Sequence, residues 1–412
     1  MKRCIRNARV ILPDTVLENG WVLLEDGWIR SVGAGACPAD AEETLDACGG
    51  YLSPGFVDLH VHGGGGGDFC DGQPEAWLAA LRTHLAGGTT TVVPTLMSTG
   101  LEGILRNSDL YLELQRNWEQ YAGIPRLGGM HLEGPYFSQM QLGAQDARFV
   151  RNPNPEEYEK ILAHNPHIVR WAAACELPGA LEFGDRLARA GVTACIGHSN
   201  ATMAQVQEAV RHGYRCVTHL YSGCSSLHRN GPYREGGVVE AAFLLDELDV
   251  EVIGDGIHLP PEFLRLIYKL KGPERMALIT DCIRPGGQNL PEHTTAYSDL
   301  ERRRPVVLEG GVAVMPDRRS FAGSVVTMDR TVQVAVQQAG IPLWEAVRMA
   351  SLNPARMLGL DQVLGSIEPG KRADLLLLDQ ALQVRACFLA GQEQAVKKNP
   401  PGTVQRTGNP RR

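Results

Sequence analysis

Short apolar runs alternate with helical patterns through the middle of this chain, and this alternation constrains the fold more than any other feature. Eight runs can be read in order: GFVDLHVH, TTTVVPT, RLGGMHLEG, HIVRWAAACEL, GVTACIGHS, CVTHLYS, VEVIGDGIH and MALITD. Helical patterns such as PEAWLAALRTHLAGG, PEEYEKILAHN and ATMAQVQEAVRHG separate most of them. Eight strands alternating with helices over about 300 residues predict an α/β fold, a (β/α)₈ TIM barrel spanning residues 54–359.

An open, doubly wound sheet is the alternative arrangement of such units. That fold commonly carries a G-x-G-x-x-G turn directly after its first strand. Here the five glycines Gly63–Gly67 begin only after two histidines, and no charged residue that could read a ribose follows at the expected distance. The sequence therefore favours the closed barrel over a nucleotide-binding sheet.

The two ends of the chain carry a different pattern, of short strands and tight turns. RCIRNARVILP, GWVLLEDGWIRSVG and YLSPGFVD open the chain, and GSIEPGKRADLLLLD and VRACFLAGQE stand near its end. Neither end has enough mass for a large core of its own, so we expect residues 1–53 and 360–392 to pair into one small β-sandwich. The polar, basic and proline-bearing segment 393–412 is expected to be disordered.

Composition narrows the class of protein. The hydrophobic fraction is 43%, the charged fraction 21% and the net charge −7, a globular balance that does not favour nucleic-acid or membrane partners. No apolar run approaches the roughly 18 residues that span a bilayer, and the start of the chain lacks the apolar region of a signal peptide. The 10 cysteines, Cys4 and Cys37 among them, are scattered without a C-x-x-C. This usage predicts unpaired core cysteines in a reducing, cytoplasmic setting.

The first strand of the expected barrel ends in two histidines. GFVDLHVH alternates with the period of a strand, so His60 and His62 point to the same side. Five glycines cannot extend a strand cheaply, because ordering glycine costs more backbone entropy than any other residue. The strand should therefore stop there, with two imidazoles at its end and a tight loop beyond. Such a pair can hold a metal ion or can simply be two surface histidines.

Further polar residues stand at the ends of the other strands. Taken singly, a histidine at a strand end is more often hydrogen-bonded scaffolding than a metal ligand, and Asp281 is either a helix cap or a base. Histidine is scarce, however, at 12 of 412 residues, and five lie at strand ends that a barrel gathers at one mouth. The strand-end set is His60, His62, Glu133, Glu176, His198, His219, Asp255, His258 and Asp281. Imidazole and carboxylate without thiolate predict a divalent-metal site, with zinc, iron, manganese or cobalt as candidates and Asp281 as the base.

Seven motifs in order resemble one known family. PGFVDLHVHG, HLEGP, IGHS, THLY, DGIH, TD and FAGS are similar to the N-acetylglucosamine-6-phosphate deacetylases of the amidohydrolase superfamily, over nearly the whole chain. The resemblance implies a metal-dependent amide hydrolase of amino sugar catabolism, which releases acetate and glucosamine 6-phosphate.

The resemblance also implies roles for matching residues. Glu133, His198 and His219 would hold the main metal ion, with zinc as the first candidate, and His60 and His62 would provide a second metal position. Asp281 would orient the water, take its proton and deliver it to the leaving amine.

The same resemblance places the substrate. His258 and Arg234 would meet the sugar phosphate, with Arg234 reaching across the interface of a homodimer. Backbone groups of Ala144, Phe321, Ala322 and Gly323 would line the sugar.

The chain departs from the family pattern near the substrate. Gln145 stands where family members carry a histidine that polarises the acetyl carbonyl, and glutamine cannot become cationic. Ser222, Gly223 and Cys224 replace the usual NAM, which removes an amide from the phosphate pocket. The following loop is longer than usual, and its Arg229 and Arg234 are either anion contacts or solvated charges.

Three functions remain open at this level. The first is deacetylation of N-acetylglucosamine 6-phosphate, and the second is the same chemistry on another N-acyl sugar or N-acyl amino acid. The third is a non-catalytic barrel module, against which stands the presence of every core ligand.

Overall fold

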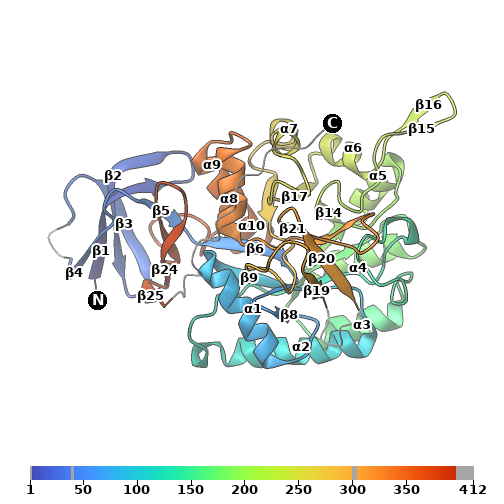
Figure 1. The fold of residues 1–412 in the computed structure, drawn as a ribbon, viewed down its shortest axis with the longest axis horizontal. Coiled ribbons are helices and arrows are strands. Elements are labelled where there is room, and N and C mark those ends of the chain that lie inside the picture. Colours follow the sequence, from blue (N-terminus) through green and yellow to red (C-terminus); the bar gives the residue numbers. More distant parts are fainter. Residues whose placement is uncertain (1, 39–40, 299–303, 396–412) are drawn as a thin grey trace.

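Eight parallel strands form a ring at the centre of the molecule (Figure 1), as seen in a computed structural model that describes residues 2–38, 41–298 and 304–395. The strands are β6 (Phe56–Val61), β9 (Thr89–Leu96), β11 (Met130–Glu133), β12 (Ile168–Ala173), β13 (Thr193–Ile196), β14 (Tyr214–Val217), β17 (Asp249–Ile253) and β18 (Met276–Ile279). Each pairs in parallel with the next, and the short β10 (Arg126–Leu127) adds to the pairing of β9. The predicted barrel and its eight strands are confirmed.

Backbone hydrogen bonds just beyond the strand ends close the ring between β6 and β18. The Asp281 N–H donates to the His60 carbonyl at 2.9 Å, and the His62 N–H donates to the Cys282 carbonyl at 2.8 Å. These bonds fix the end of the first strand against the segment that carries Asp281.

Helices cover the outside of the ring (Figure 1). They are α1 (Pro74–Ala86), α2 (Leu101–Arg116), α3 (Pro155–His164), α4 (Ala180–Ala190), α5 (Met203–Arg211), α6 (Val238–Leu244), α7 (Pro261–Lys271), α8 (Met328–Gln337), α9 (Leu343–Ala350) and α10 (Leu352–Met357), with short 3-10 turns η1 (Trp118–Gln120) and η2 (Gln139–Gln141). Local signals set their ends: the Thr202 hydroxyl and Gln205 amide form a capping box at the start of α5, and Gly191 ends α4 with φ 72°. Among the described residues no helix is long and apolar enough to cross a membrane.

The five glycines form a tight hairpin rather than an open loop. β7 (Gly63–Gly64) pairs with β8 (Gly67–Asp68), and Gly65 and Gly66 turn between them with φ 60° and 90°. A Cβ on Gly67 would clash with the Ala76 carbonyl oxygen, so α1 packs directly on this backbone. The tight loop predicted beside the barrel mouth is confirmed.

Strands from both chain ends form one sheet beside the barrel (Figure 1). It contains β1 (Lys2–Ile11), β2 (Val16–Glu25), β3 (Trp28–Ala34), β4 (Glu43–Asp46), β5 (Tyr51–Pro54), β23 (Leu375–Leu378), β24 (Val384–Leu389) and β25 (Gln392–Gln394). The predicted union of the two ends is confirmed by the antiparallel pairing of β23 with β5. Ile5, Val22, Leu375 and Phe388 belong to a separate buried core inside this unit. The boundaries at residues 53 and 360 stay a prediction; β25 continues into the segment expected to be disordered, and residues 396–412 lie outside the described residues.

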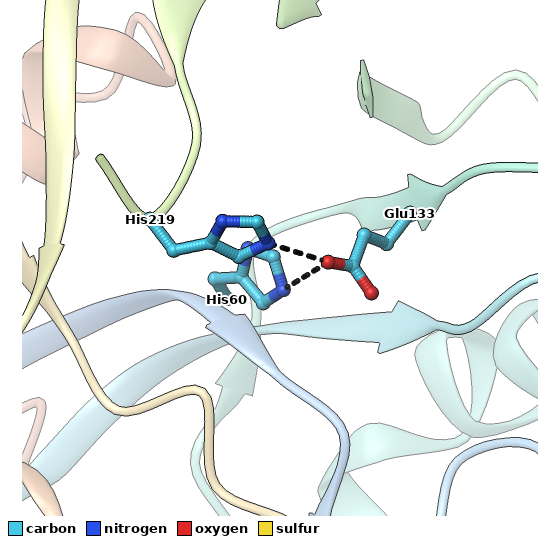
Figure 2. Close-up of side chains that lie close together, drawn as sticks. All are labelled: His60, Glu133 and His219. Atoms are coloured by element: carbon cyan, nitrogen blue, oxygen red, sulfur yellow. Dashed lines mark hydrogen bonds and ion pairs between the residues drawn. The ribbon is translucent and has the colours of Figure 1, made fainter. Parts of the chain in front are cut away.

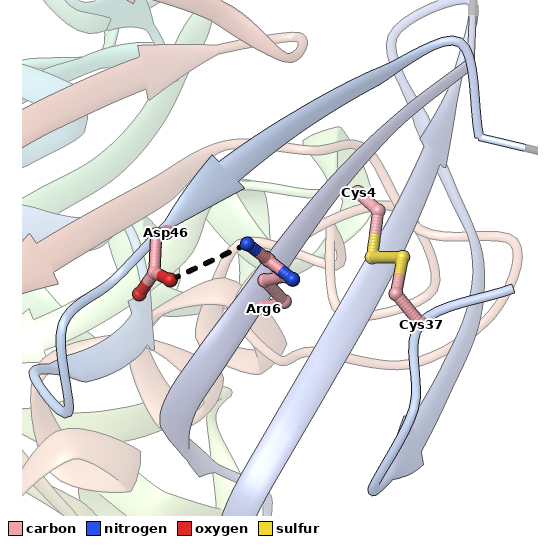
Figure 3. Close-up of a disulfide and its surroundings, with 4 residues drawn as sticks. All are labelled: Cys4, Arg6, Cys37 and Asp46. Carbon is pink, nitrogen blue, oxygen red and sulfur yellow. Dashed lines mark ion pairs between the residues drawn. A yellow bond between two sulfur atoms is a disulfide. The ribbon is translucent and has the colours of Figure 1, made fainter.

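One cysteine pair corrects the sequence-based expectation that cysteines are unpaired. Cys4 on β1 and Cys37 beyond β3 form a disulfide, beside an ion pair between Arg6 and Asp46 (Figure 3). The expectation failed because β2 pairs with both β1 and β3, which returns the segment after β3 to β1, with Cα atoms 6.8 Å apart. The other eight cysteines are free, six of them buried.

Two insertions extend the barrel; the first was not predicted, and the second is the long loop noted in the sequence, which forms a hairpin. After β18, an antiparallel sheet contains β19 (Thr295–Tyr297), β20 (Pro305–Glu309), β21 (Val312–Val314) and β22 (Phe321–Gly323). Its last strand returns to the barrel, where the Ser324 N–H donates to the Asp281 carbonyl at 2.9 Å. Between β14 and β17, the hairpin of β15 (His228–Asn230) and β16 (Tyr233–Glu235) projects from the body (Figure 1).

An aromatic cluster packs α3 and α4 against the barrel. The Phe183 ring lies 5.1 Å, centroid to centroid, from each of Tyr136, Tyr158 and Trp171, and it is fully buried. We expect Phe183→Ala to lower the free energy of unfolding by about 3–5 kcal/mol, because it removes buried apolar surface and leaves a cavity. Urea unfolding followed by circular dichroism measures this. The matched control is Leu290→Ala at an exposed site, which should change stability by no more than about 0.5 kcal/mol; equal losses in both variants would contradict this role for Phe183.

Candidate metal centre and active site

Four histidines and one glutamate meet where the barrel strands end. His60 and His62 come from the end of β6, Glu133 ends β11, and His198 and His219 each follow their strand by two residues. Nε2 of His219 lies 2.7 Å and Nε2 of His60 3.6 Å from Glu133 Oε1 (Figure 2). His198 Nε2 lies 3.1 Å from the same oxygen. His62 Nε2 lies 3.4 Å from Glu133 Oε2. The five predicted metal ligands are therefore brought together around one carboxylate.

The other ring nitrogen of these histidines is held by an acceptor. Nδ1 lies 3.2 Å from the Thr95 carbonyl oxygen in His62, 2.7 Å from that of Gln141 in His198, and 2.9 Å from that of Ser222 in His219. A carbonyl oxygen only accepts, so each Nδ1 carries the proton and donates it. The lone pair of each neutral ring is then at Nε2, facing Glu133.

This arrangement fits a divalent metal ion. Lone pairs that face a carboxylate repel it unless a cation lies between them, and imidazole with carboxylate is a donor set that zinc and related metals accept. At the barrel mouth, two groups of these side chains have ligand atoms within 4.8 Å of one another: His60 with Glu133 and His219, and His60 with His62 and Asp281. The donor set suits one ion or two.

The pKa values of Glu133 and His62 reflect how closely these charged groups lie together. Burial alone would raise the pKa of Glu133, but contacts with His198, His219 and His62 hold that pKa well below its ordinary value. Burial lowers the pKa of His62, yet Asp281 and Glu133 outweigh burial and raise it well above the ordinary value. A proton and a metal ion therefore compete for the same space between ring and carboxylate.

Asp281 lies at the edge of this cluster, where the pocket opens. Its Oδ1 is 3.1 Å from His62 Nε2 and 3.5 Å from His60 Nε2. Asp281, His198 and His219 have φ of 48°, 46° and 29°, a left-handed backbone that is uncommon outside glycine. Strain of this kind concentrates at functional sites, and here it turns three chemically active side chains inward.

A pocket of about 230 Å³ opens beside these ligands, and we call it the mouth pocket. Eight of the nine residues predicted to bind substrate line it, namely Ala144, Gln145, Ser222, Gly223, His258, Phe321, Ala322 and Gly323. The β19–β22 sheet brings the last three. Arg234 does not line the pocket: it lies on the projecting hairpin, opposite Arg229 in the strand register.

Gln145 braces the metal centre. Its Oε1 accepts from the Ser98 N–H at 2.9 Å, and its Nε2 donates to Glu133 Oε2 at 2.6 Å. A backbone N–H can only donate, so the orientation of the amide is settled by this pair. Gln145 thus holds Glu133 in place and retains one further N–H.

Two predicted carboxylates position neighbouring groups instead of facing the metal centre. Asp255 Oδ2 accepts from His258 Nδ1 at 2.7 Å, which leaves the other nitrogen of His258 as the one available to a ligand. Glu176 accepts from the Ser199 hydroxyl and the Asn200 N–H, both at 2.6 Å, and does not line the mouth pocket.

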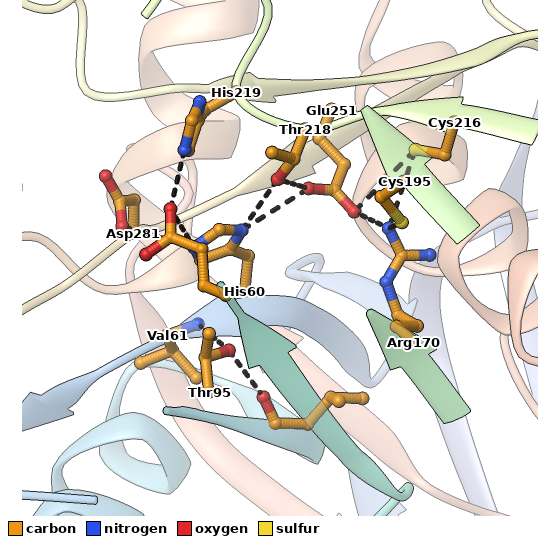
Figure 4. Close-up of polar contacts among 12 residues, drawn as sticks. His60, Val61, Thr95, Arg170, Cys195, Cys216, Thr218, His219, Glu251 and Asp281 are labelled. Atoms are coloured by element: carbon orange, nitrogen blue, oxygen red, sulfur yellow. Dashed lines mark hydrogen bonds and ion pairs between the residues drawn. The ribbon is translucent and has the colours of Figure 1, made fainter. Parts of the chain in front are cut away.

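A buried polar network beneath His60 was missed by sequence reasoning (Figure 4). His60 Nδ1 lies 2.9 Å from the Thr218 hydroxyl, which donates to Glu251 Oε2 at 2.5 Å. Because Thr218 gives its proton to Glu251, it accepts from His60 Nδ1, and His60 also keeps its lone pair on Nε2. The sequence offered only a weak signal. Glu251 in DVEVI and Arg170 in IVRWAA are charged residues inside mostly apolar strands, but the sequence does not show that they pair.

Arg170 completes this network by pairing with Glu251, and both side chains are fully buried. Cys195, Cys216 and Glu251 lie close enough together to suggest a second metal site. However, Arg170 Nη2 lies 3.2 Å from Cys195 Sγ and 3.5 Å from Cys216 Sγ. A guanidinium therefore already provides the positive charge among these three groups.

Comparison with known proteins agrees with this geometry. A model of the Amidohydrolase family matches residues 51–407, and the chain belongs to that family. It is 33% identical to an N-acetylgalactosamine-6-phosphate deacetylase of Escherichia coli O157:H7, over 95% of this chain and 99% of that protein. It is 31% identical to an N-acetylglucosamine-6-phosphate deacetylase of Lysinibacillus sphaericus, over 96% and 98%.

A solved structure supports the same relationship. A mutant of the N-acetyl-D-glucosamine-6-phosphate deacetylase from Mycobacterium smegmatis, in complex with N-acetyl-D-glucosamine-6-phosphate, superposes with a TM-score of 0.85 at 33% identity. The match covers 95% of this chain and 98% of that one. Within the amidohydrolases, the chain belongs with the N-acetylglucosamine-6-phosphate deacetylases.

The network beneath His60 predicts a measurable effect on metal affinity. Glu251→Gln keeps the shape of the side chain but removes the charge that holds Thr218 and Arg170, so the His60 ring loses its orientation. We expect metal affinity to fall by about 10–100-fold, measured by chelator competition and metal analysis of the purified protein.

Asp249→Asn is the matched control, because Asp249 lies on the same strand but pairs outward with Arg275 and Arg356. It should leave metal affinity unchanged. Metal affinity of Glu251→Gln within about twofold of wild type, with the protein folded, would show that the network does not orient His60.

Proposed function

We propose that this protein is a metal-dependent deacetylase that hydrolyses N-acetylglucosamine 6-phosphate to acetate and glucosamine 6-phosphate, a reaction of amino sugar catabolism. The convergence of His60, His62, His198 and His219 on Glu133, with Asp281 beside them, carries this proposal. The activities for which these relatives are named support the substrate class.

The residues that would hold the metal are Glu133, His198 and His219, with His60 and His62 providing a second position. Zinc is the first candidate, and iron, manganese and cobalt suit the same donors. A divalent ion bound there would lower the pKa of a water molecule and polarise the acetyl carbonyl.

Asp281 transfers the proton during the reaction, and Gln145 helps to hold the reacting groups in position. Asp281 takes the proton of the attacking water on its carboxylate and delivers it to the nitrogen of the departing amine. Its position beside His62 and at the open side of the cluster places that carboxylate between the metal ligands and the pocket. Gln145 keeps Glu133 in place and offers its remaining N–H to the acetyl oxygen.

The phosphate end of the substrate lies toward His258. Asp255 accepts from Nδ1 of His258, and with both ring nitrogens protonated the ring would donate from Nε2 to an anion. Phe321 packs against this ring with centroids 4.7 Å apart. The backbone groups of Ala322, Gly323 and Ala144 line the sugar. Ser222 and Gly223 also line the pocket, where the family usually provides an amide side chain.

N-acetylgalactosamine 6-phosphate is the second candidate substrate. One relative at 33% identity is named for that sugar. The two sugars differ only in the configuration of one hydroxyl group, so the same metal chemistry serves both, and the loops of the mouth pocket decide between them.

Acetate release from the two phosphorylated sugars and from unphosphorylated N-acetylglucosamine tests this function, with zinc, iron or manganese loaded. We expect kcat/KM for the unphosphorylated sugar to be lower by about 10²–10⁴, because two charge-assisted hydrogen bonds of about 1.5–3 kcal/mol each are lost. The ratio between the two phosphorylated sugars identifies the preferred one.

Asp281→Asn is the control for the chemistry. It should retain metal and lose kcat by about 10²–10⁴. Near-normal turnover in this variant would overturn the role of Asp281, and absence of turnover on all three sugars by metal-loaded wild type would overturn the proposed substrate.

We also infer a homodimer in which Arg234 reaches the partner's mouth pocket. Three observations support this: the hairpin projects from the body, Leu227 and Tyr233 on it are 58% and 74% exposed, and Arg234 has no ion-pair or hydrogen-bond partner among the described residues. Phe263, Leu266 and Leu270 form an exposed apolar face on α7, which a dimer interface would cover.

The dimer predicts complementation between two impaired variants. Arg234→Gln should raise KM for the phosphorylated sugar by about 10–100-fold, whereas Arg229→Gln should not. Mixing Arg234→Gln with Asp281→Asn subunits should restore activity, because each mixed dimer has one intact site. Light scattering should give twice the 44.8 kDa chain mass; a monomer, or no recovery on mixing, would contradict the arrangement.

A cytoplasmic location is the remaining part of the proposal. Eight free cysteines, six of them buried, support a reducing compartment. The Cys4–Cys37 disulfide is the one feature of the described chain that points the other way.

A further inference from the structure

A second cleft, larger than the mouth pocket, lies at the amino-terminal ends of the barrel strands. We call it the lower cleft; it has a volume of about 470 Å³, and Thr91, Trp118, Arg126, Leu364 and Arg372 are among the residues that line it. Thr91 stands near the start of β9, whereas Met97, just past the end of β9, lines the mouth pocket. About six residues of strand separate the two, a distance of about 20 Å.

Two arginines face this cleft without enough acceptors. Arg126 lies over the Trp118 ring, 4.4 Å from its centroid, and within the described chain it forms no ion pair or hydrogen bond; its Nε is buried without a partner. Arg372 donates from Nε to Asp374 at 2.6 Å, but its Nη2 is buried without a partner. Burial is the main cause that lowers the pKa of Arg126, and the nearby charge of Arg372 lowers it further.

A third unpaired donor lies in the same cleft. The Thr91 hydroxyl is buried and has no hydrogen-bond partner, and Thr91 is 1% exposed. Buried polar groups are normally satisfied, and leaving one unpaired costs about 1–3 kcal/mol. These three donors belong to the lining of one cleft, where an acceptor bound between the side chains would satisfy them.

The remaining lining indicates what that acceptor is. Glu119 is the one carboxylate among the residues lining the cleft, and it forms no ion pair with either arginine. Side-chain amides of Gln115, Asn117 and Gln120 lie around the opening, and Leu360, Val363 and Leu364 form an apolar wall. Paired guanidinium groups match the oxygens of a phosphate or carboxylate group, and the wall suits the body that carries it.

We propose that the lower cleft binds a small metabolite through a phosphate or carboxylate group held between Arg126 and Arg372. The described lining of the cleft contains no histidine and no acid–base pair, so it is a binding site, and its ligand does not reach the metal centre. This inference does not depend on the proposed deacetylase activity.

Calorimetric titration of inorganic phosphate, and separately of citrate, tests the proposal. The titrations use His258→Gln protein, so that the phosphate position of the mouth pocket is weakened. We expect one remaining site for phosphate or citrate, and a loss of affinity of about tenfold or more when Arg126→Gln or Arg372→Gln is added. Arg189→Gln, at an exposed position on α4, is the matched control and should bind as the parent does.

Binding of phosphate alone or citrate alone supports the proposal and identifies the group. Identical titrations with and without Arg126→Gln, or no binding of either probe, overturn it. A wild-type crystal soaked in tungstate gives a readout that does not depend on the folding of any variant. Anomalous density between Arg126 and Arg372 supports the site, and density confined to the mouth pocket overturns it. Acetate release is measured in a separate assay. A failure of the proposed deacetylase function would therefore not affect the conclusion about ligand binding in the lower cleft.

Discussion

The carboxylate of Glu133 is the group around which the barrel mouth is arranged. Four imidazoles present Nε2 to it, Gln145 donates to it, and backbone carbonyls or Thr218 fix the far side of each ring. Such a buried anion is stable only with cations or protons close by. The ends of parallel strands provide this arrangement, because β-ladder pairing fixes where each of these residues stands.

The layer beneath this mouth is polar rather than apolar, and that requires an explanation. A buried ion pair such as Arg170–Glu251 adds little stability compared with apolar packing, because both charges lose their hydration. Its role here is to orient other groups: Glu251 accepts the Thr218 proton, so Thr218 accepts from His60 Nδ1 and thereby sets the tautomer of His60. The left-handed backbone at His198, His219 and Asp281 serves the same end at the rim, where local strain is offset by the packing of the barrel.

Much of this architecture could be predicted from the sequence, and the remainder could not for physical reasons. The eight strands and the polar residues at their ends could be predicted because each buried parallel strand is a short apolar run that ends at a polar residue or a glycine. The Cys4–Cys37 disulfide was not, because it depends on how β1–β3 pair in space. Glu251 and Arg170 were overlooked because burial of a charge becomes interpretable only once its partner is located. The β19–β22 sheet has short strands and no strong period, yet it brings Phe321, Ala322 and Gly323 to the pocket.

Chemistry and substrate choice are built from different parts of this fold. The proposed metal ligands stand on or within two residues of strands whose register is fixed on both sides, so their convergence could be predicted from the sequence. The groups around the substrate come from loops at residues 143–145 and 222–223, from the β19–β22 sheet and, as proposed, from a partner's hairpin. Such segments accept substitutions like Gln145 without disturbing strand pairing. Relatives named for two epimeric sugars at similar identity are consistent with that division, in which, as proposed, the barrel provides the hydrolysis and the loops select the sugar.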